Sequence, residues 1–135
     1  MIIKSRDSKI ISIIGGTGMM GQMFSKVFKE KGYEVLIAGR STEITLKEAA
    51  EKGDLVIVCV PISATEKIIR EIGPFVRKEA IVSDFTSIKV KPCKDMQVYS
   101  KSQVIGGHPV FGPIPYLKGQ PFVICPERIS KKSLA

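Results

Sequence analysis

Six consecutive residues near the start of the chain have the composition of a phosphate-binding loop. They read Gly-Thr-Gly-Met-Met-Gly and are Gly16, Thr17, Gly18, Met19, Met20 and Gly21. In a G-x-G-x-x-G loop between a strand and a helix, the first glycine allows a tight turn and the second lets a pyrophosphate approach the backbone. The third lets helix and strand pack closely. We therefore predict these roles for Gly16, Gly18 and Gly21 in binding a dinucleotide, the alternative being a glycine-rich turn without a cofactor.

A second candidate contact to a nucleotide lies about twenty residues further on, where an NAD protein usually places an Asp or Glu for the ribose 2′-hydroxyl. This chain has Arg40, Ser41 and Thr42 at that point. A guanidinium makes forked, charge-assisted contacts with phosphate, and the two hydroxyls can add donors. We predict NADP rather than NAD as the cofactor. Glu43 keeps NAD possible, and a solvated turn arginine is the alternative.

Three residues that follow the most apolar strand-like run, Cys59, Val60 and Pro61, form the third candidate contact. Ligands of doubly wound folds bind at the carboxyl ends of the strands, so we expect all three to line the nucleotide site. Cys59 has no histidine near it in the sequence and is better explained as a small buried hydrophobic residue than as a nucleophile. Three widely spaced cysteines and one histidine also predict no metal site.

Strand-like runs that alternate with helical ones must position these residues. We predict strands at 10–14, 33–38, 54–60, 80–84, around 104–105 and at 121–124, and helices at 19–31, 45–52 and from about 63 to 72, with Ser63 as the cap of the last. This alternation predicts an α/β fold with a doubly wound, mostly parallel sheet of about six strands, a Rossmann-type NAD(P)-binding domain. We expect residues 1–135 to form this single domain.

The composition excludes several classes of protein. The chain has 135 residues with 44% hydrophobic residues, which indicates a globular domain and excludes disorder. It has no apolar run long enough for a membrane span, and charged residues stand where a signal peptide would be apolar, so we expect a cytoplasmic protein without a membrane partner. The net charge of +8 is scattered, so we expect no nucleic-acid partner and attribute the excess to an anionic small ligand.

Two later segments narrow the chemistry further. Residues 83–89 follow the fourth strand and read Ser-Asp-Phe-Thr-Ser-Ile-Lys; residues 106–113 follow the fifth and read Gly-Gly-His-Pro-Val-Phe-Gly-Pro. Both should reach the sheet edge that binds the cofactor. His108 is the only histidine, and an imidazole, which ordinarily titrates near pH 6.5, suits general-base work. A locally bonded turn residue is the alternative for His108, and a helix-capping role is the alternative for Ser87.

These two segments, with the glycine loop and the Val-Cys-Val-Pro strand end, resemble the nucleotide-binding domain of the prephenate dehydrogenase family. The G-H-P-V-F-G-P string is its most specific element, because that family carries a G-x-H-P-M-F-G-P-like loop here; D-F-T-S-I-K matches its D-x-x-S-V/I-K loop. The resemblance covers residues 10–126. It implies oxidative decarboxylation of prephenate to 4-hydroxyphenylpyruvate in tyrosine biosynthesis, with hydride passing to the nicotinamide. It also implies that His108 takes the proton of the substrate hydroxyl and that Ser87 fixes this hydroxyl or orients His108.

The chain departs from that family in one respect. Family members continue into a helical domain that forms a homodimer and supplies substrate-binding residues, including an arginine, and we find no such domain here. We therefore expect this chain alone to be incomplete for catalysis, with the choice between prephenate and arogenate open. One alternative is another NADP-dependent reductase of the deazaflavin type, which would lack H-P-V-F-G-P. Another is a non-catalytic dinucleotide-binding module.

Overall fold

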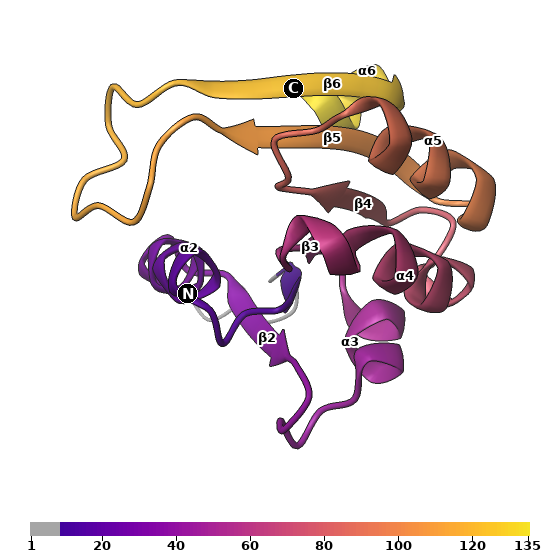
Figure 1. Cartoon of the computed structure of the whole chain (residues 1–135), viewed down its shortest axis with the longest axis horizontal. Coiled ribbons are helices and arrows are strands. Elements are labelled where there is room, and N and C mark those ends of the chain that lie inside the picture. The colour runs from indigo at the N-terminus through magenta and orange to yellow at the C-terminus, as the bar shows by residue number, and fades with distance from the viewer. Residues whose placement is uncertain (1–8) are drawn as a thin grey trace.

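Six strands form a single sheet in the computed structural model, which describes residues 9–135 (Figure 1). The strands are β1 (Ile10–Ile14), β2 (Glu34–Ala38), β3 (Leu55–Val58), β4 (Ile81–Asp84), β5 (Gln103–Pro109) and β6 (Phe122–Arg128). Their order is β2-β1-β3-β4-β5-β6; the first five are parallel, and β6 runs antiparallel to β5. The predicted mostly parallel α/β sheet of about six strands is confirmed.

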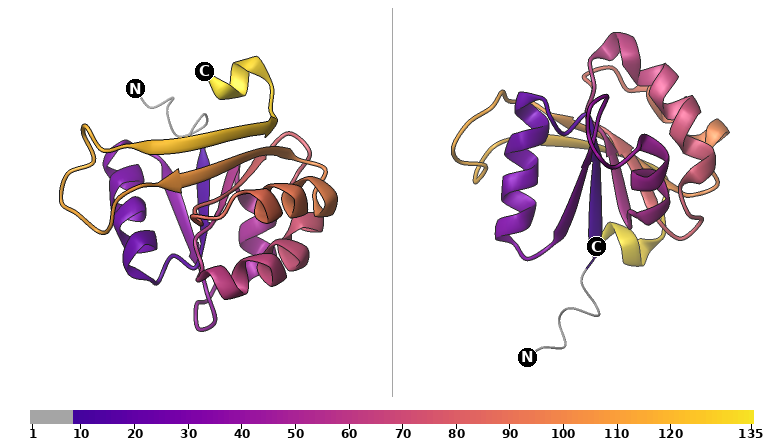
Figure 2. Two further views of the ribbon diagram at one scale, coloured as in Figure 1. Left: turned by 45° about the horizontal axis from the view of Figure 1, so that its top comes forward. Right: turned by 90° about the horizontal axis from the view of Figure 1, so that it is seen from below.

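Helices cover both faces of this sheet. They are α2 (Met19–Glu30), α3 (Leu46–Lys52), α4 (Ile62–Ile72), the 3₁₀ turn η1 (Gly73–Phe75), α5 (Val90–Tyr99) and the short α6 (Lys131–Leu134). Figure 2 shows α2 on one face of the sheet and α3, α4 and α5 on the other. Among residues 9–135, no helix is both long and apolar enough to cross a membrane.

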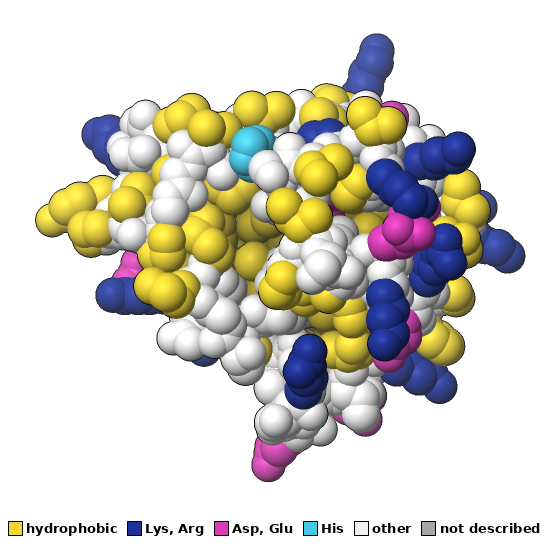
Figure 3. All heavy atoms as spheres, in the orientation of Figure 1, with side chains coloured by type: hydrophobic (Ala, Val, Ile, Leu, Met, Phe, Trp, Pro, Cys, Tyr) yellow, Lys and Arg dark blue, Asp and Glu magenta, His cyan; other side chains and the backbone are white. Residues whose placement is uncertain are grey.

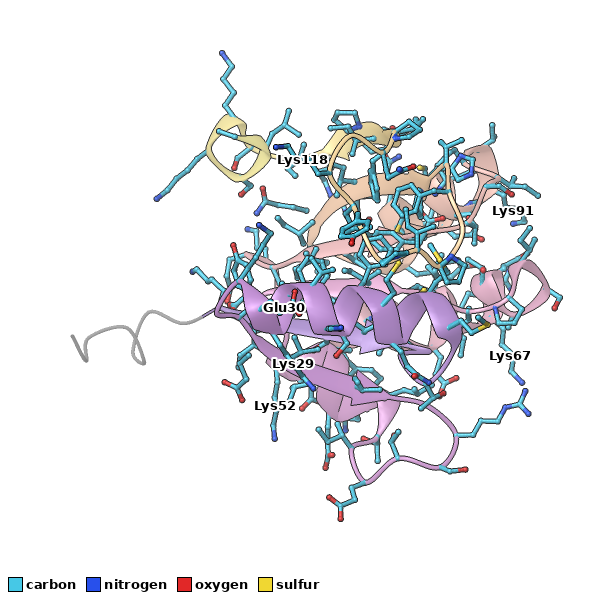
Figure 4. All side chains as sticks on the ribbon, turned by 90° about the vertical axis from the view of Figure 1, so that its left-hand side faces the viewer. Lys29, Glu30, Lys52, Lys67, Lys91 and Lys118 are labelled. Atoms are coloured by element: carbon cyan, nitrogen blue, oxygen red, sulfur yellow. The ribbon has the colours of Figure 1, made fainter. Side chains whose placement is uncertain are left out.

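The core lies on the two faces of the central strands. Ile13 and Ile57 pack under α2 with Phe24, whereas Val56 and Val82 pack with α4 and α5 on the opposite face. Strands buried on both sides are nearly continuous apolar runs, which is why the parallel strands could be recognised from composition. The outer face of α2 is charged, as Lys29 and Glu30 show in Figure 4.

Three local predictions differ from the structure. β5 extends to Pro109, so His108 lies within a strand and not in a loop after it, because antiparallel pairing with β6 continues the strand. α4 begins at Ile62 with Pro61 as its N-cap, and Ser63 does not cap it. α5 has no counterpart among the predicted helices, and its first turn accommodates Pro92 because the backbone N–H groups there need no helical partner.

Arg77 joins four neighbouring groups at the amino-terminal edge of the sheet, one of which is the exposed Glu79 carboxylate at 2.9 Å. Its guanidinium donates to the carbonyl oxygens of Glu51 (3.1 Å) and Gly53 (3.0 Å) and to Asp54 Oδ1 (2.8 Å), whose other oxygen accepts from the Ile10 N–H at 2.7 Å. Partial burial alone would raise the pKa of Asp54, but the Ile10 N–H and the Arg77 guanidinium outweigh it and lower that pKa. The ionised carboxylate is therefore the form that the fold stabilises.

We expect Arg77→Met to lower the free energy of unfolding by about 1–2 kcal/mol at pH 7, a modest value because the pair is partly exposed. A carboxylate with a lowered pKa contributes stability at neutral pH and loses it as the pH falls through that pKa. The difference between the two proteins should therefore shrink below about pH 4. Urea denaturation at pH 7 and pH 2.5 measures it, and a difference that stays constant with pH would contradict the role of Asp54.

Candidate nucleotide-binding site

The glycine loop lies between the end of β1 and the start of α2, as predicted, but its tight turn falls one residue earlier. Gly15 has a φ of +88°, and a Cβ there would lie 2.3 Å from the Cys59 carbonyl oxygen. The turn role predicted for Gly16 therefore belongs to Gly15. Gly16 is restricted differently, because a Cβ on it would lie 2.7 Å from Cγ2 of Ile37. Gly21 allows the close packing predicted for it, since its Cβ would lie 2.5 Å from the Gly16 Cα.

Gly18 is the N-cap of α2 and faces open space. A Cβ on Gly18 would meet only the Gly15 carbonyl oxygen, at 3.6 Å. No side chain caps this end of the helix, and its first turn has no acidic residue. The first N–H groups of a helix lack helical partners and carry the positive end of its dipole. This arrangement suits an anionic group bound above Gly18.

A cleft of about 900 Å³ opens at the carboxyl ends of β1 and β3, where successive connections leave toward opposite edges of the sheet. The residues predicted to contact a nucleotide that line this cleft are Thr17, Gly18, Arg40, Ser41, Thr42, Cys59, Val60 and Pro61. The structure thus brings the three predicted segments together around one cavity.

A smaller hollow of about 410 Å³ lies beside α2. Its lining includes the loop residues Met19, Met20 and Gly21, together with Phe85 and Pro109, whereas Gly16 lines neither cavity. Gly18, Cys59 and Val60 line both cavities, so the two meet at the start of α2. The residue that follows His108 therefore reaches the same region as the glycine loop.

Helices build a part of the large cleft that was not predicted from the sequence. These residues come from the start of α3 and from α4, and they are Thr45, Leu46, Lys47, Ala64, Ile68 and Glu71. The capping box of Thr45 and Glu48, which fixes the start of α3, was the available signal. It marks where the helix begins but not that this end faces a cavity.

Thr42 acts within its own loop. Its hydroxyl accepts from the Gly39 N–H at 2.9 Å and lies 2.7 Å from the Ile44 carbonyl oxygen, to which it donates. Arg40 and Ser41 are exposed at the cleft. The predicted hydroxyl donor at Thr42 is thus engaged, and this region offers a ligand the Arg40 guanidinium and the Ser41 hydroxyl.

The cysteines show no sign of nucleophilic or metal chemistry. Burial raises the pKa of the Cys59 thiol, which keeps it protonated at neutral pH and fits a packing role. All three cysteines are free. The described residues contain no cluster of His, Cys, Asp and Glu side chains that could hold a metal ion.

His108 lies in β5, and the segment after β4 leaves the strand that pairs with β5. His108 is partly buried opposite Val123 of β6, and Figure 3 shows the histidine at the surface beside hydrophobic side chains. Ser87 is exposed, two residues before Lys89. The Lys89 ammonium donates to the Gly107 carbonyl oxygen at 2.6 Å, which ties the two predicted motifs together.

Comparison with known families decides the relationship of the chain. Residues 24–134 match the model of the prephenate dehydrogenase nucleotide-binding domain. The chain belongs to the prephenate dehydrogenase family. A probable arogenate/prephenate dehydrogenase of Methanocaldococcus jannaschii is 40% identical over 140 residues, an alignment that covers 91% of this chain and 31% of the relative. The chain thus spans about a third of the length of this relative.

Solved structures agree on the fold of this prephenate dehydrogenase family domain. Synechocystis arogenate dehydrogenase superposes with a TM-score of 0.76 at 20% identity, covering 93% of this chain and 53% of that one. Prephenate dehydrogenase from Aquifex aeolicus, in complex with hydroxyphenyl propionate and NAD⁺, gives 0.71 at 20% identity, covering 93% and 54%. The family match and the Methanocaldococcus relative favour a prephenate dehydrogenase-like domain over a deazaflavin-type reductase.

Proposed function

We propose that the chain is the NADP-binding domain of an oxidoreductase that oxidatively decarboxylates prephenate or arogenate. The observation that carries the proposal is the large cleft, which has an uncapped helix start at Gly18 and an exposed cation at Arg40. Two anionic groups of one ligand, a pyrophosphate and a 2′-phosphate, would satisfy both positions. The family membership supplies the class of reaction.

Within the cleft, each wall suits one part of the nucleotide. The N–H groups at the start of α2 would hold the pyrophosphate, and Arg40 with Ser41 would hold the 2′-phosphate. Leu46, Ala64 and Ile68 offer an apolar wall for the adenine. The smaller hollow beside Met20 would receive the nicotinamide, which when bound accepts a hydride from the substrate.

His108 is the residue that we propose as the general base. A neutral imidazole accepts the proton of the substrate hydroxyl while hydride leaves the ring carbon that bears this hydroxyl. Loss of carbon dioxide with aromatisation of the ring makes the reaction irreversible. The exposed Ser87 hydroxyl would orient either the substrate hydroxyl or the imidazole. Both residues belong to segments that approach the sheet edge beside the smaller hollow, which Phe85 and Pro109 line.

We further propose that residues outside this chain complete the substrate site. The chain spans 31% of the Methanocaldococcus relative, and the family resemblance assigns the arginine for the substrate carboxylate and the homodimer contact to a helical domain. Prephenate and arogenate differ at a side-chain keto or amino group that such a domain would recognise. Three free cysteines fit a reducing compartment such as the cytoplasm.

Substitution of Arg40 tests whether the cofactor is NADP and whether Arg40 binds its 2′-phosphate. We expect Arg40→Ala to weaken NADP⁺ binding by about 10- to 100-fold, or about 1.5–3 kcal/mol for a lost charge-assisted contact, and to change NAD⁺ binding little. Calorimetric titration of this chain with both nucleotides measures the effect. Arg70→Ala is the matched control, because Arg70 is an exposed arginine paired with Glu66 outside the large cleft. Equal losses for both nucleotides would remove Arg40 from the 2′-phosphate site, and tighter NAD⁺ binding by the unsubstituted chain would reverse the cofactor assignment.

A further inference from the structure

Lys89 reaches from the start of α5 to two neighbouring strands. Its side chain is only 16% exposed, and its ammonium lies 2.5 Å from Asp84 Oδ2 at the end of β4. The same ammonium donates to the Gly107 carbonyl oxygen of β5 at 2.6 Å. That carbonyl belongs to the peptide group that links Gly107 to His108. A buried cation thus holds the backbone next to the proposed base.

The two glycines before His108 stand where there is no room for a side chain, and the first lies beside the lysine stem. A Cβ on Gly106 would lie 2.5 Å from Cys93 Sγ and 3.3 Å from Lys89 Cδ, so Cys93 fills the space that a side chain would need and the lysine stem passes close beside it. A Cβ on Gly107 would lie 3.0 Å from the Asp84 carbonyl oxygen on the other face of the strand. Side chains alternate along a strand, so the His108 side chain lies on the same face as the Cβ position of Gly106. That is the face on which the Lys89 stem lies.

Asp84 fixes the ammonium in turn. The Asp84 side chain is fully buried, and its Oδ2 accepts from Lys89 and from the Thr86 N–H at 3.3 Å, with the Thr86 hydroxyl also in hydrogen-bond contact. That hydroxyl lies 2.8 Å from the Ile88 carbonyl oxygen, so both ends of the segment that carries Ser87 are anchored. A buried ion pair contributes little net stability once desolvation is counted, whereas it fixes geometry well. The arrangement therefore favours a role of the Lys89–Asp84 pair in positioning its neighbours over a role in stability.

We propose that Lys89 is a positioning residue, which, held by Asp84, fixes the Gly107–His108 peptide and the segment of Ser87 and so sets the direction of the His108 imidazole. The proposal rests on the proposed function, because it gives a purpose to the position of His108 only if His108 is the base. It explains why D-F-T-S-I-K and G-G-H-P occur together. The aspartate and lysine of the first motif hold the carbonyl of the second, and Gly106 keeps the path open.

The single histidine allows a direct test by NMR. The chain, labelled with ¹³C-histidine, gives one imidazole Cε1–H signal, whose line width increases when the ring exchanges between orientations in microseconds to milliseconds. We expect Lys89→Met and Asp84→Asn to broaden this signal by roughly twofold or more through exchange of the ring between orientations on that timescale. Lys91→Met is the matched control, because Lys91, labelled in Figure 4, also pairs with carboxylates near the start of α5 but is exposed and does not contact β5.

The two substitutions remove opposite charges, so together they distinguish a loss of ring order from a change in the electric field at the ring. Removal of a cation and removal of an anion shift the signal in opposite directions if only the electric field at the ring changes. Opposite shifts without broadening, or a signal that stays unchanged in Lys89→Met, would overturn the proposal. If either variant fails to fold by its amide spectrum, Gly106→Ala in a Cys93→Ala background, where Lys89 Cδ at 3.3 Å becomes the nearest atom to the added Cβ, must broaden the signal relative to Cys93→Ala alone; an unbroadened signal there would also overturn the proposal.

Calorimetric titration of the same samples with NADP⁺ distinguishes failure of the positioning role from failure of the proposed function. We expect Lys89→Met to bind NADP⁺ within about twofold of the unsubstituted chain, since Lys89 does not line the large cleft. Absence of NADP⁺ binding in the unsubstituted chain would overturn the proposed function and leave the histidine result unaffected. An unchanged histidine signal with intact NADP⁺ binding would overturn the positioning role alone.

Discussion

His108→Asn is expected to lower turnover by about 10²–10⁴-fold in a protein that joins this domain to the substrate-binding residues of its family. Asparagine retains a hydrogen-bond donor and acceptor of similar size but cannot accept a proton in the pH range where an imidazole does. The affinity for NADP⁺ should stay nearly the same, because His108 does not line the large cleft. Steady-state turnover of prephenate and calorimetric titration with NADP⁺ together measure the two effects.

A substitution in the neighbouring segment provides the control. Ser87→Ala is the matched comparison, with a smaller loss expected because a hydroxyl that orients a partner does not itself transfer the proton. Turnover at the unsubstituted rate in His108→Asn would leave His108 as a residue of β5 without a catalytic role. Absence of turnover in the unsubstituted protein would favour the non-catalytic module.

The segments of the nucleotide cleft could be predicted because parallel topology alone brings them together. Thr17, Arg40 and Pro61 are far apart in the sequence, but each follows a strand of the same parallel sheet, and the carboxyl ends of such strands share one edge. Strand-like composition and the glycine or proline residues that follow each run were enough to find those ends. The residue types then indicated a phosphate ligand, independently of the resemblance.

The surroundings of His108 could not be predicted in the same way. Its place within β5 depends on antiparallel pairing with β6, thirteen or more residues later in the chain, which no local pattern specifies. The contact of Lys89 with the Gly107 carbonyl depends on the path of a long side chain past Gly106. Such contacts are set by packing between elements, and a one-dimensional pattern carries no record of them.

The choice between Gly15 and Gly16 for the tight turn was another question that only the fold could decide. The two glycines are adjacent, and the G-x-G-x-x-G string begins at the second. The deciding contact is the Cys59 carbonyl oxygen at the end of β3, which leaves no room for a side chain on Gly15. Because β1 and β3 are neighbours only in the folded sheet, the position of the turn follows from strand order and not from the motif.

Gly15→Ala should therefore be among the most destabilising substitutions in the chain. An alanine there adopts a left-handed conformation, which costs about 1–2 kcal/mol, and its Cβ overlaps the Cys59 backbone just beyond the end of β3, which costs about 1–3 kcal/mol more. Gly32→Ala is the matched control, because Gly32 has a φ of +93° but nothing within 4 Å of the added Cβ. It should lose only the conformational part, and urea denaturation of both variants measures the difference. Equal losses in the free energy of unfolding would mean that the Cys59 backbone moves to accommodate the added methyl group. The contact with the Cys59 carbonyl oxygen would then not be the reason for glycine at this position.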